Sequence, residues 1–138
     1  MTHIRTRLRM DVRAALVVAM IDVTWPQRHW GKEHVSDLPR GGVATPRTRN
    51  DLIDVGSVNR AIDLIVVLKR EGGDDIEDIL DADSTLIERA VLPVLEGYST
   101  DFGLVETQIA PDGRGSTTVG ELSMLFRVVT ITDEDNPE

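Results

Sequence analysis

The chain has 138 residues, of which 41% are hydrophobic and 28% charged, and this balance predicts one soluble globular domain rather than a disordered segment. The absence of cysteine excludes disulfides, thiolate zinc sites, iron–sulfur clusters and thiol nucleophiles. A formal net charge of −9 argues against a dedicated nucleic-acid binder, because neutralising phosphates requires clustered lysine and arginine. We expect residues 1–132 to form the domain and the acidic residues 133–138 to form a disordered tail.

An amphipathic helix is predicted over residues 4–21. Its apolar residues recur at steps of three and four, and its arginines share another face, which we interpret as solvated; the alternative is a surface that docks an acidic neighbour. The apolar run Ala14–Ile21 is too short to span a bilayer and no signal cleavage site follows it, so we expect no membrane partner. The apolar residues are Ile4, Leu8, Val12, Ala15, Leu16 and Ala19, and the arginines are Arg5, Arg9 and Arg13.

Residues 22–56 are punctuated by glycine and proline and give little regular pattern beyond a short strand at Gln27–Trp30. The segment Pro39–Asn50 has the composition of a long, mobile, basic loop. Loops of that length in a compact domain are usually functional or disordered.

The remaining elements follow clearer patterns. Residues 57–69 (SVNRAIDLIVVLK) alternate as a central strand, and residues 75–95 have helical spacing, with Pro93 marking a kink or an early stop. Two further strands, 102–109 and 120–132, are joined by a hairpin connection over 110–115. The sequence therefore predicts an α+β single domain, with a mixed or antiparallel sheet of about four strands and two main helices packed on one face.

Asp81, Asp83 and Thr85 spell D-x-D-x-T, which in haloacid dehalogenase-type phosphatases supplies a nucleophile, an acid/base and a phosphoryl ligand. That chemistry needs the aspartates at the end of a buried strand, but the preceding run DDIEDIL carries four acids and cannot be one. On a helix, Asp81 and Thr85 lie one turn apart and Asp83 points elsewhere. We interpret the motif as part of a helix.

Other chemical signatures are weaker still. The same aspartates lack the glycine and terminal glutamate of a calcium loop, and the run GRGSTT has no P-loop lysine. His29, Glu33 and His34 offer metal ligands at a spacing that fits neither a helix face nor a strand face, so a surface loop is favoured. Trp25 and Trp30 are expected in the core or an interface rather than stacked on a base. We expect no catalytic residues, metal or cofactor.

The order of elements resembles the tail terminator proteins of long-tailed bacteriophages and related gene transfer agents, over nearly the whole chain. The matching features are an N-terminal helix, a proline-containing loop before a long strand, an acidic L-D-x-x-x-x-x-I-E-x-A helix, and two closing strands. They correspond to Ile4–Met20, to Leu38-Pro39 through Lys69, to Leu80-Asp81 through Ala90, and to a final strand ending Phe126–Thr130. One departure is Arg40–Asp51, which lacks the hydrophobic strand character expected after Leu38-Pro39, so the strand count over residues 22–56 stays open.

The resemblance implies a structural protein that assembles with itself, as a hexameric ring, at the tail–neck junction of a virion built in the host cytoplasm. Such a ring caps the tail tube, ends its elongation and offers a docking surface to the head-side connector, while DNA passes through its pore without specific binding. Within it, Arg40, Arg47, Arg49 and Asp51 are the expected contacts to tube or connector. Glu71, Asp74 and Asp75 are the expected pore-facing acids, with helix capping and surface solvation as the alternative.

Three other interpretations stay open. One is a different neck or tail-completion ring protein, which would share size and build. A second is a metal-dependent phosphohydrolase that uses Asp81 and Asp83. A third is a monomeric adaptor that binds a single host protein.

Overall fold

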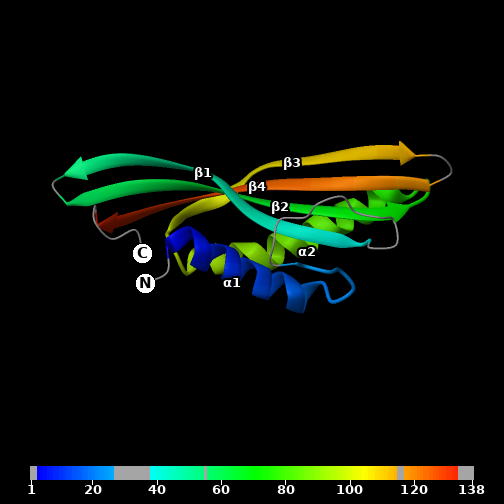
Figure 1. Ribbon diagram of the computed structural model, residues 1–138, viewed down its shortest axis with the longest axis horizontal. Helices are drawn as coiled ribbons and strands as arrows, with labels where there is room; N and C mark the ends of the chain where they lie inside the picture. Colours follow the sequence, from blue (N-terminus) through cyan, green and yellow to red (C-terminus); the bar gives the residue numbers. More distant parts are fainter. Residues whose placement is uncertain (1–2, 27–37, 55, 115–116, 134–138) are drawn as a thin grey trace.

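The computed structural model describes residues 3–26, 38–54, 56–114 and 117–133. In these residues two helices lie on one face of a four-stranded antiparallel sheet with the strand order β1-β2-β4-β3 (Figure 1). The predicted α+β fold is thereby confirmed in its antiparallel form. The elements are α1 (Ile4–Ala19), β1 (Arg40–Asp54), β2 (Ser57–Gly72), α2 (Ile76–Glu96), β3 (Asp101–Arg114) and β4 (Thr117–Asp133).

The sheet consists of two long hairpins whose second strands pair at its centre. β1 pairs with β2 and β3 with β4, and β2 then pairs with β4 from Ser57 opposite Asp133 to Gly72 opposite Thr118. Asp54 and Ser57 close the β1–β2 hairpin. Gly56 in that turn has a φ of 91°, a left-handed conformation that glycine adopts without steric cost.

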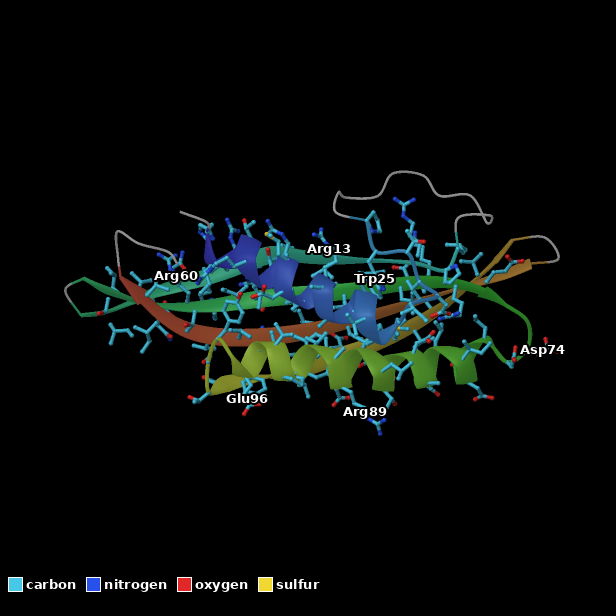
Figure 2. All side chains as sticks on the ribbon, turned by 90° about the horizontal axis from the view of Figure 1, so that it is seen from below. Arg13, Trp25, Arg60, Asp74, Arg89 and Glu96 are labelled. Atoms are coloured by element: carbon cyan, nitrogen blue, oxygen red, sulfur yellow. The ribbon has the colours of Figure 1, made fainter. Side chains whose placement is uncertain are left out.

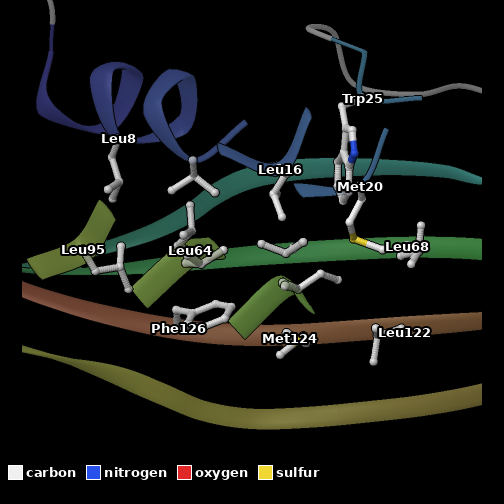
Figure 3. Packing of buried hydrophobic residues seen from close by; sticks show 14 of the residues in the cluster. Leu8, Leu16, Met20, Trp25, Leu64, Leu68, Leu95, Leu122, Met124 and Phe126 are labelled. Carbon is white, nitrogen blue, oxygen red and sulfur yellow. The ribbon is translucent and has the colours of Figure 1, made fainter. Parts of the chain in front are cut away.

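The core lies between the helices and one face of the sheet (Figure 3). Along β2 and β4 every second side chain points toward the helices, as the two-residue period of a strand requires. Leu64 and Phe126 face each other across the central pair and are fully buried, as are Leu8 of α1 and Leu95 of α2. Both helices therefore contribute an apolar stripe to one shared core.

The prediction of a basic loop over Pro39–Asn50 was wrong, because this segment forms most of β1. The register against β2 shifts between Ala44 and Arg47, and Pro46 falls inside that irregularity. β1 is an edge strand, where a proline and a bulge interrupt few hydrogen bonds. The indole ring of the buried Trp25 packs directly on the backbone of Gly41. Any larger residue at position 41 would place its Cβ 2.3–2.7 Å from the ring carbons, so this contact requires glycine.

Smaller differences concern the ends of elements. α2 does not stop at Pro93 but continues to Glu96. β3 and β4 extend to Arg114 and Thr117, so the second hairpin connection is shorter than predicted. The predicted strand at Gln27–Trp30 and most of the acidic tail lie outside the described residues.

Candidate interaction surfaces

The D-x-D-x-T stretch lies in the middle of α2, and its side chains do not converge. Asp81 is exposed, and its backbone carbonyl accepts a hydrogen bond from the Thr85 hydroxyl at 3.3 Å. Asp83 is buried on another side of the helix. The helical interpretation is confirmed, and the motif does not have the strand-end geometry that places two carboxylates around a phosphoryl group.

Asp83 belongs to an ion-pair cluster with β2. Arg70 donates to both carboxylate oxygens of Asp83, at 2.8 and 3.2 Å, and its third contact is Asp22 at 3.1 Å. Burial raises the pKa of the Asp83 carboxyl, and the guanidinium opposes that rise. Burial alone lowers the pKa of Arg70, but the two carboxylates outweigh it and raise that pKa. The fork of hydrogen bonds fixes α2 against the end of β2, which is a structural use of this aspartate.

Among the described residues, no three histidine, cysteine, aspartate or glutamate side chains are grouped so that they could hold a metal ion. His29, Glu33 and His34, considered above as ligands, lie outside those residues. Neither α1 nor α2 is long and apolar enough to cross a membrane.

The face of the sheet opposite the helices carries no helix in the part of the chain that the structure describes (Figure 1). Two apolar pairs lie near its centre: Ile65 is opposite Leu125, and Ala61 is opposite Val129. These residues are half-buried by their neighbours in the sheet alone. A sheet face that carries such apolar pairs and no helix is a candidate contact surface. We call it the open face.

A charged pair separates these apolar pairs, because Asp63 lies between Ala61 and Ile65 on the same side of β2. Asp63 is directly opposite Arg127, and the guanidinium donates to the carboxylate at 3.1 Å. The contact residues predicted from the sequence lie on the same face, because residues opposite one another in an antiparallel pair share a side. Their partners on β2 all have odd numbers, from Asn59 to Lys69, and the odd-numbered residues of β2 lie on the open face. The predicted residues are Arg40, Arg47, Arg49 and Asp51.

The structure thus aligns the four predicted contact residues in a row along the edge strand, not at one point. Arg40 is opposite Lys69, near the end of β2 that leads into α2, whereas Asp51 is near the β1–β2 turn. Arg47, Arg49 and Asp51 are exposed and Arg40 is half-buried.

The three acids predicted to line a pore lie at one end of the molecule, where β2 leads into α2. Glu71, Asp74 and Asp75 are all exposed, and Figure 2 shows Asp74 at that end. Asp75 is the residue before α2 but makes no side-chain capping hydrogen bond. Glu77 and Asp78 occupy the first turn, where negative charge interacts favourably with the helix dipole.

The opposite end is formed by the β1–β2 turn, which projects beyond both helices (Figure 1). Leu52 and Ile53 beside this turn are more than half exposed. Ile131 of β4, opposite Asn59, is 66% exposed toward the same end. We call these three residues the hairpin tip. Exposed apolar side chains gathered at one end of the molecule make this tip a candidate partner-binding feature.

The outer side of α1 carries further apolar side chains that the sequence analysis did not single out. Met10, Val17, Val18 and Ile21 are all exposed. Met10 and Val18 lie two residues after members of the buried stripe, and that offset is a signal from which this outer side could be predicted. The arginines predicted to be solvated are half-buried instead: Arg9 donates to Thr45 of β1 and to Thr6.

The two helices are joined by the only tyrosine of the chain. The Tyr98 hydroxyl donates to Asp11 at 2.5 Å, and the Arg7 guanidinium lies 5.9 Å from the centre of the ring. Burial, together with the hydrogen bond to Asp11, raises the pKa of Tyr98 well above its ordinary value. The phenol therefore stays protonated and holds the end of α2 to α1.

No protein-family model matches this chain. A comparison with curated proteins likewise found no significant match.

Proposed function

We propose that this chain is a structural protein of the tail terminator kind. It would assemble with itself as a hexameric ring that caps the tail tube, ends elongation and presents a docking surface to the head-side connector. The support from the sequence is the order of elements, in which a helix, a long strand, an acidic helix and two closing strands follow one another as in that family. In this proposal the work is done by surfaces, and no residue acts as a catalyst.

The observation that carries the proposal is the amount of apolar surface outside the core. The described residues have a complete core, yet the hairpin tip and the outer side of α1 each expose large apolar side chains, and the apolar pairs of the open face are only half-buried. A monomer rarely exposes several such patches, because each costs free energy in water. Subunits of an assembly bury such patches against one another and against other components.

The charges fit the passage of DNA through such an assembly. The net charge is −9, and Glu71, Asp74 and Asp75 are exposed together at one end. Negative charge around a pore repels phosphates, so DNA slides through without adhering. In the ring we assign these acids to the pore and the arginines of β1 to the tube or connector.

The test is to delete the gene from the particle that encodes it and to examine the lysate by negative-stain electron microscopy. A terminator is the component that stops tube growth, so its loss should give overlong tails without heads. Normal-length tails detached from heads would instead indicate a connector, the closest alternative. Normal joined tails would refute any role in assembly and would redirect attention to Asp81, where Asp81→Asn would test Mg²⁺-dependent phosphatase activity.

A further inference from the structure

The side of α1 turned away from the core carries a second apolar row. Its members are Met10, Ala14, Val17, Val18 and, in the turn after the helix, Ile21, and we call them the α1 outer row. Steps of four, three and one residues keep the four members within α1 on one side of the helix, opposite the buried stripe, and Ile21 follows the C-cap residue Met20. Val18 is 79% and Ile21 88% exposed. Two turns or more of apolar surface in water point to a binding surface rather than to scattered exposed residues.

The outer side of α2 offers a different surface. Ala82, Leu86 and Pro93 are exposed and spaced by four and seven residues, which places them on one side of the helix. Leu86 is 43% exposed. Arg89 is exposed within this shorter apolar row, and the exposed acids Asp78, Asp81 and Glu96 lie beside it.

The two helices carry opposite charge. α1 has four arginines and one aspartate, whereas α2 has six acidic residues and one arginine. Asp83 is already neutralised by Arg70, which leaves the other five acids to define the outer charge of α2. Figure 2 shows Arg13 toward one long side of the molecule and Arg89 and Glu96 toward the other. A basic apolar surface and an acidic apolar surface therefore lie on opposite sides of the same subunit.

We infer that the α1 outer row binds the acidic outer side of α2 in a second copy of this chain. Apolar side chains meet in the middle of this contact, and Arg7 and Arg13, which border the α1 outer row, face carboxylates. A contact between two α1 helices would place arginines against arginines, which is unfavourable. Because the contact joins two different surfaces, it is heterologous, which is the type of contact from which cyclic rings are built. The inference rests on the proposed function and names the subunit interface of that ring.

The experiment exploits the absence of native cysteine, since a single introduced cysteine then reports contacts between copies. Full-length Val18→Cys and Leu86→Cys variants are mixed in equal amounts and oxidised over a series of protein concentrations. Both positions are exposed, so the fold should be unchanged, which circular dichroism verifies. We expect the ratio of mixed to identical disulfide dimers to be severalfold higher than random pairing gives. Added salt should lower this excess, because it screens the charges. The double variant should give a ladder of oligomers.

The control pair is Thr107→Cys with Leu86→Cys, because Thr107 is also exposed but lies on β3, outside the surfaces proposed to bind partners. Mixed dimers of the test pair that never exceed this control would overturn the inference, as would a predominance of Val18–Val18 disulfides. Cross-linking captures brief encounters, so a ring that is stable only on the tube still gives the expected excess. If the disulfide experiment fails but gene deletion gives overlong tails, only the proposed interface is refuted. If gene deletion gives normal tails, the proposed function is refuted whatever the disulfide experiment shows.

Discussion

The two faces of the sheet are formed by the same strands but have different surroundings. On β2 and β4, Leu64 and Phe126 are fully buried beneath the helices, whereas the adjacent Ile65 and Leu125 are only half-buried by neighbouring strands. The helices add a second layer to one face alone, so that face supplies the stability of the fold. The other face carries fewer apolar residues, which the Asp63–Arg127 pair separates, and in the proposed assembly partners bury them. Substitutions at matched positions on the two faces test whether the faces differ in this way.

The largest effect is expected from removing a leucine side chain on each face. Leu64→Ala leaves a cavity beneath the helices and should lower the free energy of unfolding by about 2–5 kcal/mol. Leu125→Ala removes a side chain that is still in contact with water, and should cost about 1 kcal/mol or less. Urea unfolding of the two variants measures both values. Equal losses would mean that the isolated chain already covers its open face.

The ion pairs of the two faces should differ next. Asp83→Asn leaves the Arg70 guanidinium without its main partner at a buried position, and we expect a loss of about 3 kcal/mol. Asp63→Asn breaks the pair with Arg127, whose side chain is half exposed, and should cost about 0–1 kcal/mol. The same denaturation measurement compares them. A larger loss for Asp63→Asn would assign the open face a structural role that this account denies.

Two glycines provide a smaller, purely steric comparison. A Cβ on Gly120 would lie 2.6 Å from the Ile76 side chain and 2.7 Å from that of Leu80, so Gly120→Ala should overpack the core and cost about 1–3 kcal/mol. A Cβ on Gly103 would meet nothing within 4 Å, and Gly103→Ala should change stability by only a few tenths of a kcal/mol. Thermal unfolding of both variants checks this. Unchanged stability of Gly120→Ala would show that α2 is free to shift on the sheet.

The smallest effect is expected at alkaline pH, where Tyr98 joins the two helices that cover the core. Its pKa is raised in the folded chain, so between about pH 10 and that higher value the unfolded state loses a proton that the folded state keeps. The stabilisation is fully present below about pH 10 and decreases as the pH rises further. Tyr98→Phe should cost about 1 kcal/mol at neutral pH and flatten the alkaline decline. Ultraviolet titration of this sole tyrosine provides the measurement; ionisation near its ordinary pKa would contradict the buried hydrogen bond.

Strong periodicity made most of the fold predictable. α1, α2, β2, β3 and β4 each follow a regular repeat of apolar residues, and all five were predicted. β1 was missed because Gly41, Gly42 and Pro46 interrupt its alternation, and its conformation depends on pairing with β2. The turn at Gly56 and the threonines between the arginines were the local indications of a hairpin.

The candidate surfaces were less accessible from the sequence. The helical interpretation of Asp81–Thr85 followed from its acidic surroundings, but the pairing of Asp83 with Arg70 depends on how α2 packs on β2, which sequence spacing does not specify. The predicted contact arginines were placed in a loop, and only the register of β1 shows that they share the open face. The buried stripe is enough to predict α1, so the prediction of the helix does not by itself indicate a second apolar row on its outer side.

The central claim is that exposed surfaces, and not the aspartate motif, carry the function. The most direct measurement is the tail-length distribution in gene-deleted particles complemented with one of two variants. Ile131→Glu places a charge on the exposed hairpin tip without disturbing the core, and we predict overlong tails, while Asp81→Asn should restore normal joined tails. Normal tails with Ile131→Glu and defective particles with Asp81→Asn would contradict the account.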